Sequence, residues 1–292
     1  MTTTAERRTI ASSPAAPSKT GGLLRATYIV WRRDLLRYWR DRARVVFSFV
    51  QPLLYLVVFG SGLSSALGGG FLAGAGAGGA GLSYTQFIYP GVVSMTILFT
   101  AIFGAMSIVW DREFGFMREL LIAPIDRTAI AIGKTLGGAT QALMQGVIVL
   151  VLAPFLGVTL TLVQVVELLA LMTVLAFGLS AFGVAIGSRM RSMQGFQVVM
   201  NFVMMPMFFL SGALFPLIGL PGWMTVLTRL DPASYGVDPI RRVLLGSSGF
   251  PVERMAITLF DQTVPILAES AIVVAFGLVM MAIAAINFQQ RD

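Results

Sequence analysis

Few residues of this chain could do chemistry, because its 292 residues include no histidine and no cysteine. The chain therefore cannot build a serine–histidine–acid triad, a histidine-ligated zinc site, a thiolate nucleophile, a disulfide or an iron–sulfur site. Gly133-Lys134-Thr135 matches the end of a Walker A loop, but the first glycine of that motif would stand at position 128, which is a threonine. We expect no catalytic residue, metal site or cofactor in this chain, and no binding of ATP by this chain alone.

The most distinctive polar feature is a charged stretch between two apolar runs, residues 110–124. Helical spacing places Phe114, Met117 and Leu121 on one face, and Pro124 ends the helix because proline disfavours helical backbone in the residue before it. An amphipathic helix over 111–123 with five charges cannot lie in hydrocarbon. We interpret it as a handle on the water side, by which a separate protein moves the membrane part. Its ionisable residues are Asp111, Arg112, Glu113, Arg118 and Glu119.

Uncharged polar side chains occur inside the apolar runs. Gln141 and Gln145 stand one helical turn apart and share a face. They could hold helices together, which is the interpretation we favour, or line a path for cargo with Asn201 and the methionine-rich run around Met204. Two small-xxx-small pairs, which allow close helix packing, are Gly133 with Gly137 and Gly183 with Gly187.

The composition indicates what must position these residues. The chain is 56% hydrophobic and only 12% charged, with a mean hydropathy of +0.82, whereas soluble domains carry about 25% charged residues. It is therefore expected to be an integral membrane protein. The net charge of +7 does not indicate nucleic-acid binding, because the arginines flank apolar runs, where they orient a protein in the bilayer.

The predicted fold class is an all-α integral membrane protein with six transmembrane helices. Each span has about the 20 apolar residues that a hydrocarbon core of about 30 Å requires. An N-terminal interfacial amphipathic helix precedes the first span, the charged helix follows the second, and an outer re-entrant helical hairpin precedes the last. The spans are expected at about 45–67, 87–110, 135–157, 168–188, 196–215 and 266–288.

Three segments lie outside the spans. Residues 1–22 are rich in Ser, Thr, Ala and Pro and are expected to be a disordered cytosolic tail, so that one transmembrane domain covers 23–292. Residues 216–264 contain an apolar piece too short to cross, which predicts the re-entrant hairpin. The helix over 23–44 is expected to lie in the membrane interface on its apolar face, which comprises Leu24, Tyr28, Trp31, Leu35 and Tyr38.

Six spans place both termini on one side of the membrane. In this arrangement most Lys and Arg residues lie on that side, and the outer segments hold only Arg229, Arg241, Arg242 and Arg254. Because positive charge accumulates on the cytoplasmic side, both termini are expected to be cytosolic in a multi-pass protein of the plasma membrane.

The order and spacing of several short patterns resemble one transporter family. These patterns are Arg112-Glu113-x-Gly115-x-x-x-Glu119-Leu120-Leu121-x-x-Pro124 running on to Gly133-Lys134, Leu210-Ser211-Gly212-x-x-Phe215-Pro216, Leu220-Pro221-x-Trp223, and Pro232-x-x-Tyr235-x-x-Asp238-x-x-Arg241. The chain resembles the type-2 permease (membrane) subunit of ATP-binding-cassette (ABC) transporters, and is most similar to permeases of daunorubicin-resistance-type exporters. It departs from them at Asp231, where such permeases often have asparagine.

The resemblance implies roles for these patterns. The charged helix would be a cytosolic coupling helix that docks on a nucleotide-binding subunit, and the outer hairpin would act as a gate. The ATPase-coupling residues would be Arg112, Glu113, Gly115, Arg118, Glu119, Leu120 and Pro124. The outer motif would comprise Ser211, Gly212, Phe215, Pro216, Pro221, Trp223, Pro232, Tyr235, Asp238 and Arg241.

The resemblance also implies partners. Two copies of an ATPase subunit would bind ATP and Mg, and a second permease subunit would complete a homodimer or a heterodimer. Cargo would pass at the interface of the two permeases, near the second and fifth spans. Aromatic and methionine residues favour a hydrophobic or amphiphilic cargo, such as a drug, antibiotic or lipid, moved outward.

Two alternatives remain open from the residues. An ion-coupled secondary transporter needs ionisable groups near the midplane, and the carboxylates close to spans, Glu167 and Glu269, lie near outer ends. A non-transporting membrane scaffold would explain the absence of a chemical site, but would need neither the charged helix nor the shaped outer hairpin.

Overall fold

The computed structural model describes residues 19–60, 62, 83–115, 126–215, 217, 219–246, 252, 256–259 and 262–290. These residues are mostly helical. Two short antiparallel strands, β1 (Thr258–Leu259) and β2 (Gln262–Thr263), form the one sheet found among them. The helices are α1 (Lys19–Arg40), α2 (Arg42–Leu54), the π-helix η1 (Tyr55–Phe59), α5 (Tyr84–Gly104), α6 (Met106–Glu113), α8 (Arg127–Leu150), the 3-10 helix η3 (Ala153–Leu156), α9 (Leu162–Gly187), α10 (Met193–Leu210), α11 (Gly222–Leu230), α12 (Ser234–Gly246) and α13 (Ile266–Gln289).

Four helical segments of the described chain are long and apolar enough to cross a membrane: Tyr84–Glu113 (α5 and α6), α9, α10 and α13. The other two expected spans are not among them, and residues 61 and 63–67 of the first lie outside the described residues. At 45–67 the described apolar helix is the shorter Phe49–Phe59. At 135–157 the matching helix, α8, is about 36 Å long at 1.5 Å per residue, but its glutamines, threonines, glycines and Lys134 lower its hydropathy.

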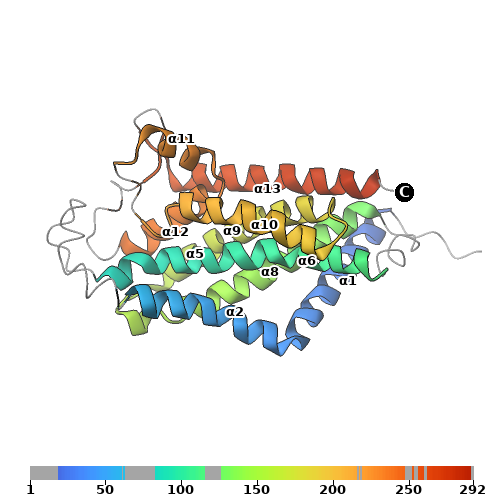
Figure 1. Ribbon diagram of the computed structural model, residues 1–292, viewed down its shortest axis with the longest axis horizontal. Coiled ribbons are helices and arrows are strands. Elements are labelled where there is room, and N and C mark those ends of the chain that lie inside the picture. Colours follow the sequence, from blue (N-terminus) through green and yellow to red (C-terminus); the bar gives the residue numbers. More distant parts are fainter. Residues whose placement is uncertain are drawn as a thin grey trace, which may run out of the picture.

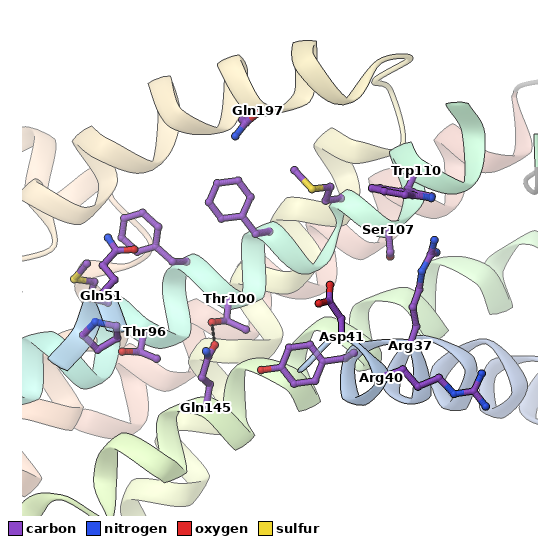
Figure 2. A pocket seen from close by; sticks show the side chains of 16 residues that line it. Arg37, Arg40, Asp41, Gln51, Thr96, Thr100, Ser107, Trp110, Gln145 and Gln197 are labelled. Carbon is purple, nitrogen blue, oxygen red and sulfur yellow. Dashed lines mark hydrogen bonds between the residues drawn. The ribbon is translucent and has the colours of Figure 1, made fainter. Parts of the chain in front are cut away.

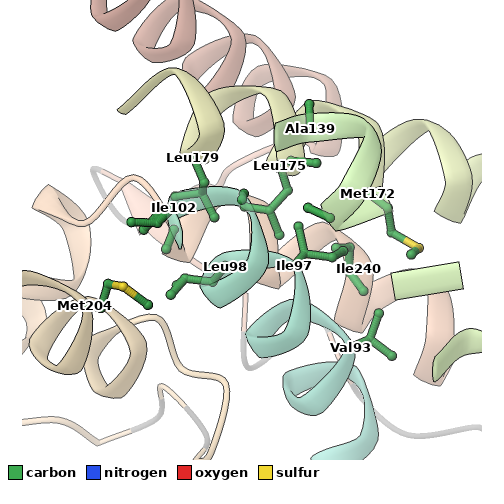
Figure 3. Packing of buried hydrophobic residues seen from close by; sticks show 14 of the residues in the cluster. Val93, Ile97, Leu98, Ile102, Ala139, Met172, Leu175, Leu179, Met204 and Ile240 are labelled. Carbon is green, nitrogen blue, oxygen red and sulfur yellow. The ribbon is translucent and has the colours of Figure 1, made fainter. Parts of the chain in front are cut away.

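The helices form one bundle around α5 (Figure 1). α8 and α9 pack against α5, α13 packs against α9, and α10 lies over α5 and α6. α1 crosses α8 at one end of the bundle, which we call the α1 end, and α11 and α12 lie at the opposite, α11 end. The core is continuous from helix to helix. Figure 3 shows Val93, Ile97, Leu98 and Ile102 of α5 meeting Ala139 of α8, Met172, Leu175 and Leu179 of α9, Met204 of α10 and Ile240 of α12.

Both small-xxx-small pairs pack helices together, as predicted. A methyl group on Gly133 would lie 2.8 Å from Cβ of Val30 in α1, and one on Gly183 would lie 2.7 Å from the carbonyl oxygen of Ile102 in α5. Any larger residue would therefore force α1 away from α8, or α9 away from α5.

The N-terminal helix differs from its prediction in its bounds. It begins at Lys19, inside the predicted tail, and ends at Arg40, and α2 begins two residues later. Leu24 and Tyr28 of the predicted apolar face are exposed, whereas Ala26, Val30 and Asp34 are buried. This buried face packs on glycines of α8, which allow close approach because they have no side chain.

Candidate coupling and transport site

A buried group of charges joins three helices at the α1 end. The Lys134 ammonium of α8 lies 2.9 Å from Asp34 of α1 and 2.8 Å from Asp111 of α6. It also donates a hydrogen bond of 3.1 Å to the hydroxyl of Ser107. The three charged side chains are at most 4% exposed. Such ions are stable inside a protein only when they are paired, so they hold α1, α6 and α8 in a fixed relation.

Two arginines of α1 complete this group, which we call the Lys134 network. Arg33 donates to Asp111 at 2.6 Å and Arg37 at 3.1 Å. Both are about half exposed, and Arg37 lies over the ring of Trp110, 5.4 Å from its centroid. Asp111, the first residue of the charged stretch, is therefore turned into the bundle and not toward solvent.

The next two residues of the stretch are bound to the turn between α9 and α10. Arg112 donates to the carbonyl oxygens of Ser188, at 2.8 Å, and Met190. The exposed carboxylate of Glu113 accepts a hydrogen bond of 2.9 Å from the backbone N–H of Met193, the first residue of α10. An acid at this position satisfies a free N–H group at the helix N-terminus.

The charged helix does not begin as a separate element at 111. Residues 111–113 are the last residues of α6, which ends at Glu113, and two residues later Gly115 has a φ of +82°, in the left-handed region. Glycine adopts this backbone without a steric cost. The other predicted coupling residues lie outside the described residues; they are Arg118, Glu119, Leu120 and Pro124.

A cavity of about 900 Å³ lies next to the Lys134 network, between α1, α2, α5, α6, α8 and α10. Its wall contains Phe99 and Phe103 of α5, and charged residues of α1 and the following turn line one end (Figure 2). The other end is lined by uncharged polar side chains from four helices: Gln51, Thr96, Thr100, Gln145 and Gln197. This volume is in the range of small-molecule sites.

Of the four residues proposed from sequence to line a path, only Gln145 lines this cavity. Its side-chain oxygen accepts a hydrogen bond from Thr100. Gln141 and Met204 are buried elsewhere in the bundle, and Asn201 is exposed on α10. Gln197, one helical turn before Asn201, contributes the polar side chain of α10 instead.

At the α11 end, α12 is fixed by a second buried group, the Arg242 cluster of Asp238, Arg241, Arg242 and Glu269. Arg242 donates to Asp238, to Glu269 of α13 at 2.9 Å and to the carbonyl oxygen of Val264 at 2.8 Å. Arg241 donates to the carbonyl oxygen of Gly212 and lies over the ring of Phe87. The cluster therefore joins α12 to α13, to the turn after α10 and to α5.

The other described residues of the outer motif have mixed positions. Gly212 has a φ of +74° and ends α10 with Ser211, whose hydroxyl donates to the carbonyl oxygen of Phe208 at 2.7 Å. The Tyr235 hydroxyl donates to the carbonyl oxygen of Arg229 at 2.8 Å, which ties α12 to α11. Pro221 precedes the first residue of α11, and Trp223 is 67% exposed on it. Phe215 and Pro232 are half-buried, and Pro216 lies outside the described residues.

Asp231 joins α11 to α12. Its carboxylate accepts a hydrogen bond of 2.9 Å from the N–H of Ala233, and burial raises its pKa to about 7. Because the folded pKa is above the ordinary value of 3.8, folding favours the protonated form, and stability falls as the pH rises from about 4 to 7. The neutral asparagine of similar permeases fits this environment.

At pH 8 we expect Asp231→Asn to be more stable than the parent chain by about 2–4 kcal/mol and therefore to unfold at a higher temperature. Near pH 4 the two chains should be equally stable. Thermal unfolding in detergent across this pH range measures it. Asp126→Asn is the matched control. The Asp126 carboxylate also accepts a hydrogen bond from the backbone N–H two residues later, that of Thr128 at 2.9 Å, but Asp126 is exposed. An equal pH dependence in both variants would contradict the prediction.

Comparison with known proteins decides the family. A model of a family described as "ABC-2 type transporter" matches residues 25–245, about three quarters of the chain. This chain belongs to the ABC-2 type transporter family. The resemblance found in the sequence is therefore confirmed, and the chain is a membrane transport permease of an ABC system, which works with an ATP-binding subunit.

Relatives of this ABC-2 permease have matching names. Nodulation protein J of Rhizobium leguminosarum bv. trifolii is 30% identical over 74% of the chain and 80% of its own length. The inner membrane transport permease YadH of Escherichia coli K12 is 27% identical over 76% of the chain and 84% of its own length. The putative transport permease ycf38 of Porphyra purpurea is 28% identical over 73% of the chain and 71% of its own length.

The ion pairs at both ends of this ABC-2 permease do not follow from local spacing. Lys134 stands in an incomplete Walker match and in a family pattern, and Asp34 stands in neither. A signal was present, because Asp34 is an acid between arginines on a helix, and Lys134 is a lone cation beside an apolar run. Ions next to membrane segments are expected to have partners, but the partners lie 100 residues apart in the chain.

Proposed function

We propose that the chain is the membrane half of an ATP-driven exporter that moves a hydrophobic or amphiphilic compound outward across the plasma membrane. The observation that supports this most is the Lys134 network. It fastens α6, the helix that leads into the charged stretch, to α1 and α8 beside the cavity. A force applied to the charged stretch would therefore move the cavity wall directly.

The topology proposed with this function has six crossings and cytosolic termini. α8 and the α2–η1 segment would provide the two crossings beyond the four apolar ones. Arg127 at the start of α8 donates to the carbonyl oxygen of Gln289 at the end of α13, and Arg189 after α9 donates to Asn287. Thus the start of α8, the end of α9 and the end of α13 share the α1 end, as an even number of crossings requires.

The energy would come from a separate nucleotide-binding subunit in two copies, which holds ATP and Mg. The charged stretch from Arg112 to Pro124 would dock on it as the coupling helix. A second permease, identical or not, would close the exposed side of the cavity, and the α11–α12 hairpin would gate the outer end. In this arrangement Glu113 serves both the docking surface and the N-terminus of α10.

The test is to purify the full chain from its native membrane, identify an accompanying ATPase, and reconstitute the complex in liposomes with a fluorescent hydrophobic dye. We expect ATP-dependent dye export that stops when the Walker lysine of the ATPase is replaced. Glu119→Ala should reduce ATPase docking and export at least about tenfold. Glu167→Ala, which changes an exposed glutamate at the start of α9, is the matched control.

The contrary outcome is export driven by a proton gradient without any ATPase and lost in Glu269→Gln. That result would establish a secondary transporter instead. The structure gives Glu269 another role, since its carboxylate is paired with Arg242.

A further inference from the structure

The cavity holds an unusual distribution of polar groups. Among the described residues, the charged side chains that line it are Arg37, Arg40 and Asp41, and they stand at the end next to the Lys134 network (Figure 2). Arg37 is already paired with Asp111. The other end, which we call the amide end, is lined by described side chains that are polar but uncharged, with three amides and two hydroxyls from α2, α5, α8 and α10.

One amide at the amide end, that of Gln145, lacks a hydrogen-bond partner among the described residues. Gln145 is 1% exposed, and its side-chain oxygen is bound to Thr100, but its side-chain nitrogen has no hydrogen-bond partner among the described residues. A buried polar atom without a partner costs about 1–3 kcal/mol, so this position favours a ligand that can complete the bond. If the amide is turned over, its oxygen becomes the free atom, and the requirement for a hydrogen-bonding ligand is the same.

The wall between the two ends is apolar. Met95, Phe99, Phe103 and Met106 line it along one face of α5 and α6. Aromatic and methionine side chains accommodate apolar chains of different shape. None of the described residues that line the amide end offers a counter-ion, so a charged ligand group placed there would stay unpaired at a large cost.

From this distribution we propose that the cavity binds an uncharged amphiphile, whose hydroxyl or amide groups lie among Gln51, Thr100, Gln145 and Gln197 and whose apolar part lies on Phe99 and Phe103. This proposal rests on the proposed function, because it defines the class of cargo that the same site binds. It is narrower than the proposed function, because it excludes amphiphiles whose charged head would lie at the amide end.

The test uses three probes with the same ten-carbon chain, each carrying a photoreactive diazirine: decyl glucoside, decyl sulfate and decyltrimethylammonium. The complete complex in lipid nanodiscs is labelled with each probe, and labelled peptides are identified by mass spectrometry. We expect decyl glucoside to label residues 95–106 at a half-saturating concentration at least about tenfold lower than that of either charged probe.

Two variants locate the polar end. Gln145→Leu should raise the half-saturating concentration of decyl glucoside about fivefold, the effect of one hydrogen bond. Gln141→Leu is the matched control, because it changes the same residue type one turn earlier on α8, outside the cavity lining, and should leave labelling within about twofold. If Gln145→Leu fails to fold, Gln197→Leu, on an exposed side chain, replaces it with the same expected direction.

The failure of this proposal differs from that of the proposed function. Equal labelling by all three probes, no effect of Gln145→Leu, or a cavity filled by the second permease so that no probe labels it, would overturn the proposal even if ATP-driven export is observed. Selective labelling that Gln145→Leu weakens would support the binding site even if export failed.

Discussion

Replacing Lys134 by methionine is expected to destabilise the chain by about 3–5 kcal/mol, because it removes the closest counter-ion of buried Asp34 and leaves it, among the described residues, only Arg33, 3.8 Å away. Asp111 would keep Arg33 and Arg37, but Asp34, which is 4% exposed on its side chain, would lose its closest cation. The expected result is a large fall in unfolding temperature in detergent and, in surviving complexes, ATP hydrolysis with little export.

The rescue separates charge pairing from packing. In the double variant Lys134→Met with Asp34→Asn, one positive and one negative charge are removed together, so most of the lost stability should return. Arg25→Gln, an exposed change on the same helix α1, should have an effect within about 0.5 kcal/mol. If Lys134→Met were as stable as the parent chain, the Lys134 network would not hold α1 to the bundle.

Arg242→Met should have a comparable or larger effect at the α11 end. It removes the cation that lies between Asp238 and Glu269, whose side chains are 1% and 0% exposed. One oxygen of each carboxylate already has no hydrogen-bond partner among the described residues. Two buried like charges would then face each other, and we expect a loss of about 3–5 kcal/mol or more, with faster proteolysis of the segment between α10 and α13.

Adding Glu269→Gln to Arg242→Met should restore much of this loss, since one negative and one positive charge of the cluster, those of Asp238 and Arg241, then remain. Arg229→Met is the matched control, because its side chain is only half-buried and has one long contact, 3.5 Å to Thr258. Unfolding temperature and protease sensitivity measure all three variants. A double variant less stable than Arg242→Met alone would show that Glu269 is not held by charge pairing.

The charged stretch illustrates how far sequence reasoning reached. Its charges predict a place outside hydrocarbon, and this stays a prediction. The sequence does not indicate that Asp111 points into the bundle while the residues after it do not, because Asp111 is buried by α1 and α8, which lie far away in sequence. A charged residue at the end of an apolar run has the same pattern whether it points to water or to a buried partner. The predicted ATPase-facing roles of Arg118 and Glu119 stay predictions.

The sequence by itself determined the class of this protein. Hydropathy requires a helical membrane protein, the missing histidine and cysteine exclude most chemical sites, and the ordered motifs identify the family. Hydropathy and composition are sums over residues, and the motifs are local spacings along the chain. None of them requires knowledge of which residues are neighbours in space.

Only the tertiary structure decided which polar residues act together. Lys134 meets Asp34 across 100 positions, and Gln145 meets Thr100 across 45. The same long-range packing placed Gln141 outside the cavity and Gln145 inside it, although both share a helix face. The physical reason is that pairing depends on which helices cross. A local pattern marks Gly133 as a place of close packing, but it does not show that the partner is Val30 of α1.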